Sequence, residues 1–382
     1  MLEVNINMIY NDKQIEPGGD ALSKNRVIWL DFARALAILS VVIMHCTEHV
    51  FNMDFDALGN MRIAFQLFRD ACFILGRLGV PAFLMISGCL LLPRDYTDSK
   101  KVLSFYKKNL LPLLITSEVW IVIYGIRHFV RGTEGYGILA LLEEMFFLKT
   151  NEMSHMWYIP MIIGMYFIIP FLSNAVRNIK GKALWIPVSI VLVATFAFNF
   201  LKALNEAFGW GISFNTVVDM TFLGGTYGVY LIMGLMIQRG DFKKIRTPIL
   251  LAVSLISFAL TVYTSFGLRS IDYSYRLWYD VPGIWITSVC MVELISRVDF
   301  SHGPLNRLSS AAASVSALSF GMYFIHLPLI IDFGPVLDNI GLPEPVMVMI
   351  YTVIVFILSY LIAFVISKIP VVKRLMLNIK SK

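Results

Sequence analysis

The sequence is poor in charged residues and in cysteine, and both shortages narrow the class of protein. Only 15% of its 382 residues are charged, whereas soluble domains have about 25%, so a soluble globular domain is excluded. The four cysteines lack C-x-x-C spacing and predict neither a disulfide framework nor a zinc site, although a Cys46–Cys72 pair stays open. Residues 1–25 lack the apolar core of a cleavable signal peptide, so the first helix is expected to act as the insertion signal.

Apolar residues dominate instead. Hydrophobic residues make up 57% of the chain and the mean hydropathy is +0.71, which indicates an all-α, polytopic membrane bundle. The stretches 136–148 and 203–220 are less certain, and either could lie in the interface or dip into the membrane. We expect about ten transmembrane helices, each near the ~20 residues that cross a bilayer, at residues 28–47, 71–92, 109–126, 156–173, 183–200, 221–238, 247–265, 277–297, 312–334 and 346–366.

The basic residues predict the orientation of these spans. Loops on the side of the N-terminus carry most of the Lys and Arg residues, which by the positive-inside rule places both termini in the cytoplasm. We therefore predict a flexible cytoplasmic tail at 1–25, a transmembrane domain at 26–370 and a basic cytoplasmic tail at 371–382.

The first span carries three ionisable side chains, Asp31, Arg34 and His45. An ionisable group inside a bilayer costs about 2.5–3.5 kcal/mol or more, so its default interpretation is a functional site. Arg34 and His45 are eleven positions apart, which places them within roughly 20° of one helix face and about 16 Å apart along its axis. The plainer alternatives are that Arg34 extends to the headgroups or pairs with Asp31, and that His45 makes an ordinary interhelical hydrogen bond.

Three other spans place polar residues at the level of His45. Arg77 lies about 9 Å below the outer end of the second span, His155 precedes the fourth, and His326 lies in the outer half of the ninth. Such convergence is what an outward-opening catalytic or binding pocket would need. The alternatives are a structural counter-charge for Arg77 and ordinary interfacial positions for the two histidines.

Two carboxylates complete the candidates. Glu48 lies one turn beyond His45 and is predicted to orient its imidazole, unless it is simply solvated. Glu118 lies near the middle of the third span, where a carboxylate needs a partner. No metal site is expected.

Four motifs follow one another along residues 26–366. They are Leu30-Asp31-Phe-Ala-Arg34-Ala-Leu-Ala, continuing to His45; Arg77-Leu-Gly-Val-Pro-Ala-Phe-Leu-Met-Ile-Ser-Gly88; His155-Met-Trp-Tyr-Ile-Pro-Met-Ile-Ile-Gly-Met-Tyr-Phe-Ile-Ile-Pro170; and Ser319-Phe-Gly-Met-Tyr-Phe-Ile-His326. In this order they resemble acyltransferase family 3, bacterial integral-membrane acyltransferases with an Arg-x10-His pattern, and most closely its compact O-acetyltransferases. One departure is the loop before the third span, which has Lys107 and Lys108 where many members carry Arg-x-x-Arg.

The resemblance implies a multi-pass enzyme of the bacterial cytoplasmic membrane. It would move an acyl group, usually acetyl, from cytoplasmic acyl-CoA to a hydroxyl of an envelope glycan or its lipid-linked precursor. Acetyl-CoA or another acyl-CoA is then the donor substrate, and no tightly bound cofactor is implied. His45 would be the general base, or a covalent acyl carrier, and Arg34 with Asp31 would bind the donor. Our candidates for orienting the acceptor or stabilising the oxyanion are Arg77, His155, Trp157, Tyr323 and His326, with Glu48 and Glu118 in support.

A transporter or channel is the competing class, because buried His, Arg and Glu also mark permeation routes. The sequence shows no internal repeat, which argues against many transporter folds. The expected partners are acyl-CoA, a glycan or lipid-linked sugar, and the lipid bilayer. The net charge of +6 is small for this length and gives no reason to expect nucleic acid.

Overall fold

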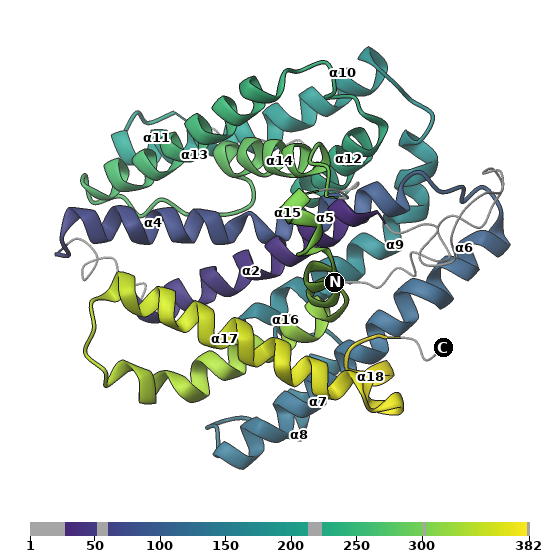
Figure 1. The fold of residues 1–382 in the computed structure, drawn as a ribbon. Coiled ribbons are helices and arrows are strands. Elements are labelled where there is room, and N and C mark those ends of the chain that lie inside the picture. The colour runs from purple at the N-terminus through teal and green to yellow at the C-terminus, as the bar shows by residue number, and fades with distance from the viewer. Residues whose placement is uncertain (1–26, 52–59, 213–223, 301–302, 380–382) are drawn as a thin grey trace.

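Every regular element that the structure describes is a helix (Figure 1). This computed structural model describes residues 27–51, 60–212, 224–300 and 303–379. The all-helical fold expected from the sequence is therefore confirmed. The predicted tail at 1–25 lies outside the described residues.

The helices follow the apolar spans of the sequence. Two of the short segments, η1 and η3, are π-helical, and η2 is a 3-10 turn. In chain order the elements are α2 (Ile28–Val50), α4 (Ile63–Arg77), α5 (Gly79–Leu91), α6 (Ser99–Phe105), η1 (Tyr106–Leu110), α7 (Leu111–Arg131), α8 (Ile138–Met145), η2 (Ser154–Trp157), α9 (Tyr158–Val176), α10 (Lys182–Leu192), η3 (Val193–Ala197), α11 (Phe198–Phe208), α12 (Gly225–Arg239), α13 (Thr247–Arg269), α14 (Pro282–Ser296), α15 (Gly303–Asn306), α16 (Ser309–Asp338), α17 (Glu344–Ser367) and α18 (Pro370–Met376).

Within the described ranges, eight helical runs are long and apolar enough to cross a membrane, with α4–α5 and similar consecutive helices counted as one run. This confirms the multi-pass bundle. The sixth and eighth predicted spans contain α12 and α14, which have only 15 residues each. α14 begins at Pro282 because proline favours the first turn of a helix. Residues 277–281, predicted as the start of the eighth span, form a connection instead.

The second span begins earlier than predicted, at Ile63 rather than at residue 71. The polar residues Gln66, Arg69 and Asp70 lower the hydropathy of this turn, which is why the sequence pattern excluded it. All three are nevertheless buried. Arg269 of α13 compensates for their burial, because it donates to Gln66 Oε1 at 3.1 Å and to the carboxylate of Asp70.

α2 crosses the centre of the bundle, where it packs against α16, α4, α5 and α17. α2 and α16 run parallel, since Arg34 meets Ser316 near the start of both helices and His45 meets His326 further along. We call these two ends of the bundle the Arg34 end and the His45 end. The two helices thus give the bundle one shared internal face.

α17 runs back along α16 in the opposite direction. Ser314 and Tyr360 are hydrogen-bonded near the start of α16, and Tyr351 donates to Asp338 near its end. α2 therefore begins, and α17 ends, at the Arg34 end. The basic loops gather at this end too, through the contacts Phe32–Phe300, Arg297–Ile245, Arg239–Ile179 and Arg177–Asp95.

α5 and α12 approach one another through glycines. A Cβ on Gly88 would lie 2.0 Å from the carbonyl oxygen of Leu231, and one on Gly234 would lie 1.9 Å from that of Met85. No side-chain carbon tolerates such distances, so small residues are required at this crossing, as at many helix contacts in membranes. The contact anchors α5 and, through it, the end of α4.

Two less certain stretches have partial answers. The stretch 136–148 contains α8, whose Leu139 and Leu142 are exposed while Glu144 is buried, as in an interfacial helix. Of the stretch 203–220, residues 213–220 lie outside the described part of the chain, as do 380–382 of the predicted C-terminal tail. Part of that tail forms α18, and Trp120 donates to the Met376 carbonyl at 2.8 Å.

Candidate active site

Three histidine rings meet in the interior of the bundle. His45 comes from α2, His155 from η2 and His326 from α16. The His326 ring lies 5.1 Å from that of His45 and 5.3 Å from that of His155, and the His45 and His155 rings are 6.4 Å apart. All three are buried. The structure thus brings together the residues whose depth in the sequence predicted convergence, and we call them the histidine cluster.

Glu48 gives His45 a defined orientation. Its Oε2 lies 2.8 Å from Nδ1 of His45, one turn earlier on α2. A carboxylate can only accept, so in the neutral ring the proton of this pair belongs on Nδ1. Nε2 of His45 then keeps its lone pair and is the atom that can accept a proton.

Backbone carbonyls and phenols position the other two histidines. Tyr323 donates to the carbonyl of His155 at 2.5 Å, and the Tyr124 hydroxyl lies 3.4 Å from His155 Nε2. Nδ1 of His326 lies 3.2 Å from the Met322 carbonyl. His155 Nδ1 and His326 Nε2 are buried without a hydrogen-bond partner in the part of the chain that the structure describes. An unsatisfied buried polar atom costs about 1–3 kcal/mol, so a polar substrate atom would stabilise both nitrogens.

Arg77 lies at the end of α4, beside this cluster. Its guanidinium lies over the rings of Trp278, at 4.5 Å, and Tyr279, at 5.3 Å, in the arrangement of a cation–π contact. Nη1 is 3.3 Å from the Tyr279 hydroxyl and Nη2 is 3.8 Å from Oε1 of Glu48. The carboxylate of Glu48 therefore links Arg77 to His45.

Trp157 belongs to the aromatic group around Arg77. Its ring lies 5.0 Å from that of Trp278 and 5.4 Å from that of Tyr279. Neither partner follows from the sequence, because its hydropathy predicts a span over residues 277–297. Their place in the connection before α14 lets them reach Arg77, and the only signal for them was a pair of aromatic residues at a span end.

At the Arg34 end, Arg34 is buried and does not extend to the surface. Its Nη1 lies 3.5 Å from Ser316 Oγ and 3.8 Å from the carboxylate of Asp31. Arg34 and His45 therefore both face α16, with an axial offset of about 16 Å. Lys107 and Lys108, the departure from the family pattern, are exposed on η1.

Glu118 is placed differently from the other candidates. It lies half-buried on α7, and its Oε2 has no hydrogen-bond partner among the residues described. No contact found in the described ranges joins it to the histidine cluster. A supporting role for Glu118 in the chemistry therefore has no geometric basis here.

A cavity of about 400 Å³ adjoins Glu48 and Arg77 at the His45 end. Three further arginines line it, Arg69, Arg269 and Arg276, and we call it the basic pocket. Asp70 lies behind the wall and pairs with both Arg69 and Arg269. In the sequence these three arginines are indistinguishable from ordinary loop charges, because the residues they contact lie far away in the chain.

The described residues include no group of three or more His, Cys, Asp or Glu side chains that could hold a metal ion. The four cysteines, including Cys46 and Cys72, are free.

The chain matches a known protein family over most of its length. Residues 27–368 match the family model described as an acyltransferase domain. No curated protein and no solved structure matches the chain. The match covers Arg34, Arg77 and the histidine cluster.

Proposed function

Because the chain belongs to acyltransferase family 3, and is thus a multi-pass membrane acyltransferase, we propose that it moves an acyl group from acyl-CoA to a glycan hydroxyl. The acyl group is usually acetyl, the donor is cytoplasmic, and the acceptor is an envelope glycan or its lipid-linked precursor. The donor is a substrate, and no tightly bound cofactor takes part. The membrane is the bacterial cytoplasmic membrane.

One observation carries this proposal. The hydrogen-bonded pair of His45 and Glu48 faces two further histidines, and Arg34 lies on the same face of the same helix. A base with an orienting carboxylate is the arrangement that removes a proton from a hydroxyl nucleophile. Arg34 is a buried cation about 16 Å from His45 along the helix axis. Its charge suits the charged part of an acyl donor.

The distribution of charge supports the assignment of the two ends. The basic loops gather at the Arg34 end, which the positive-inside rule places in the cytoplasm together with both termini. The phosphates of CoA would meet positive charge there, and the extended thioester arm would follow the face between α2 and α16. The histidine cluster would then receive the thioester from one end and the acceptor from the other.

The chemical step follows from these positions. Nε2 of His45 removes the proton of the acceptor hydroxyl as its oxygen attacks the thioester carbonyl carbon. The tetrahedral intermediate collapses by breaking the carbon–sulfur bond, and the proton on His45 passes to the leaving thiolate of CoA. A covalent acyl-histidine would split the same transfer into two steps.

The developing oxyanion needs donors close to the reacting carbon. The guanidinium of Arg77 can donate to this oxyanion, whereas the unpartnered nitrogens of His155 and His326 carry lone pairs in the neutral rings and would accept from hydroxyls of the acceptor. Tyr323 contributes by fixing the backbone of His155.

Acceptor-dependent release of free CoA tests the proposal. The purified full chain in nanodiscs is mixed with acetyl-CoA and a glycolipid extract of bacterial membranes, and the free thiol is measured. We expect acetyl-CoA to bind and CoA to be released only with an acceptor. Acetyl-CoA that fails to bind would refute its assignment as the donor. CoA release that continues unchanged in His45→Ala would refute His45 as the general base.

A further inference from the structure

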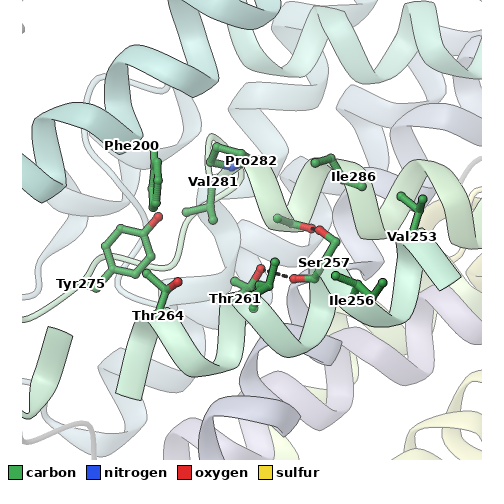
Figure 2. A pocket seen from close by; sticks show the side chains of 12 residues that line it. Phe200, Val253, Ile256, Ser257, Thr261, Thr264, Tyr275, Val281, Pro282 and Ile286 are labelled. Carbon is green, nitrogen blue, oxygen red and sulfur yellow. Dashed lines mark hydrogen bonds between the residues drawn. The ribbon is translucent and has the colours of Figure 1, made fainter. Parts of the chain in front are cut away.

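An apolar groove of about 340 Å³ runs along α13, between α11 and α14 (Figure 2). Figure 2 shows Phe200 and Tyr275 at one end of it and Val253, Ile256 and Ile286 at the other. Apart from a few hydroxyls its lining is hydrocarbon. The groove is therefore suited to an apolar chain.

α13 gives the groove its length and its access to lipid. The lining extends along this helix from Val253 to Thr264, which corresponds to about 16 Å. Ile256 and Leu260 are each 59% exposed, as expected for side chains that face the hydrocarbon of a bilayer. A chain in the groove could enter sideways from the membrane.

The groove leads into the basic pocket. Tyr275 lines both, and α13 continues beyond Thr264 with Ser265 and Arg269, which line the basic pocket. A third cavity of about 240 Å³ shares Phe200 with the groove and Arg276 with the basic pocket. One helix thus carries an apolar lining along its length and a cationic lining at its end.

The charges of the basic pocket favour an anion. Four arginines line it with the carboxylate of Glu48, and Asp70 behind the wall pairs with two of them, so the group as a whole carries a net positive charge. Arginine suits phosphate because its planar guanidinium can donate two hydrogen bonds at once. Nε of Arg77 is buried and has no hydrogen-bond partner among the side chains the structure describes. Burial and a hydrogen bond to Glu206 raise the pKa of Tyr273, another lining residue, to about 12, so its phenol stays neutral and does not repel an anion.

The third cavity is mixed in charge. Lys202 and Arg276 line it together with Glu206 and Asp280. A phosphate therefore finds its counter-charge in the basic pocket, on the side of Glu48 and Arg77.

From this continuity we propose that the acceptor is a glycan joined through phosphate to a lipid chain. The chain occupies the apolar groove and the phosphate occupies the basic pocket. This proposal rests on the proposed function, because it identifies the acceptor of that reaction. The order of the sites is chain, phosphate, then Glu48 and His45, which matches the order of lipid, phosphate and glycan hydroxyl in such a molecule.

The test measures binding to the purified full chain in nanodiscs, with no acyl donor present. Farnesyl diphosphate serves as the amphipathic probe, farnesol as the probe without charge, and pyrophosphate as the probe without a chain. We expect farnesyl diphosphate to bind at least about tenfold more tightly than either partial probe, because both sites contribute.

Two variants separate the sites, and each has a matched control. Arg276→Gln should weaken farnesyl diphosphate and pyrophosphate alike by about tenfold, whereas Arg131→Gln, another exposed arginine, should change neither. Ile256→Trp should weaken farnesyl diphosphate and leave pyrophosphate unchanged, because it fills the groove. Leu255 is 60% exposed on the same helix and does not line the groove, so Leu255→Trp should have no effect.

Three results would overturn the proposal. Equal binding of farnesol and farnesyl diphosphate would leave the arginines without a role. If phosphatidylglycerol displaces farnesyl diphosphate completely, the groove is a site for bulk lipid. If Leu255→Trp and Ile256→Trp weaken farnesyl diphosphate equally, the farnesyl chain does not bind in the groove. The binding test measures no acyl transfer, whereas the proposed function is tested by CoA release. Either proposal can therefore fail while the other one holds.

Discussion

Nδ1 of His45 and Oε2 of Glu48 are 2.8 Å apart on a single α-helix, and the same carboxylate faces Arg77 at 3.8 Å. Glu48 therefore contacts His45, the proposed base, with one oxygen and faces Arg77, which lines the basic pocket, with the other. An acceptor bound in the pocket would touch the residue that orients the base.

Replacement of His45 by alanine should abolish acyl transfer. A general base contributes about 10²–10⁴ in rate, so we expect acceptor-dependent CoA release to fall by at least that factor. The matched control is His49→Ala, one turn further along α2, where the ring contacts Asp338 and Tyr351 instead. Equal loss in both variants, or a loss of thermal stability in His45→Ala alone, would assign His45 a structural role.

Glu48→Gln tests whether the Glu48 carboxylate positions the His45 imidazole and stabilises its charged form. The amide still reaches His45, but it lacks the charge that stabilises an imidazolium during transfer. We expect kcat to fall by about 10²-fold while KM for the acyl-CoA donor stays the same. Partial recovery in Glu48→Asp is expected, because the charge returns with a shorter reach. A change in donor KM with unchanged kcat would contradict the assignment.

Arg34→Ala should chiefly weaken donor use, and Arg34→Lys should fail to restore it. Lysine keeps the charge but lacks the planar fork that can contact Ser316, Asp31 and a donor group together. The measurement is KM for acetyl-CoA at saturating acceptor, where we expect an increase of about tenfold or more. Arg34 would be excluded from donor binding by an unchanged KM in both variants.

Gly234→Ala should destabilise the bundle by about 1–3 kcal/mol through overpacking, because its Cβ would meet the Met85 carbonyl at 1.9 Å. Gly164 is the matched control, since a Cβ there meets nothing within 4 Å. The thermal midpoint of the protein in detergent should fall in Gly234→Ala and stay level or rise slightly in Gly164→Ala. Equal midpoints would show that α5 and α12 can separate without cost.

The parts of the site that follow from helix periodicity were predictable. The eleven-residue spacing of Arg34 and His45 predicted a common face, and the structure places Ser316 and His326 of α16 against that face. The alternation of spans predicted the shared depth of His155. These inferences need only the geometry of one helix and the direction in which it runs.

The remaining parts depend on which helices are neighbours, and periodicity does not contain that information. Arg77 and Tyr279 are 202 positions apart in the chain, and Asp70 pairs with both Arg69 and the distant Arg269. Hydropathy also misplaced the start of α4 and of α14, because a buried polar turn resembles a loop and an apolar connection resembles a span. The basic pocket is lined by α4 and by the connection before α14, the two segments that hydropathy misplaced. The sequence therefore does not reveal the pocket.

α2 is regular from Ile28 to Val50, whereas several other helical runs of the bundle are interrupted. The backbone breaks at Leu78 between α4 and α5, and π-helical segments interrupt the runs α6–α7 and α10–α11. Such segments bend more readily than a regular helix. As a regular helix, α2 holds Arg34 and His45 at a constant separation. A donor whose arm is shorter than this separation would therefore not reach the base.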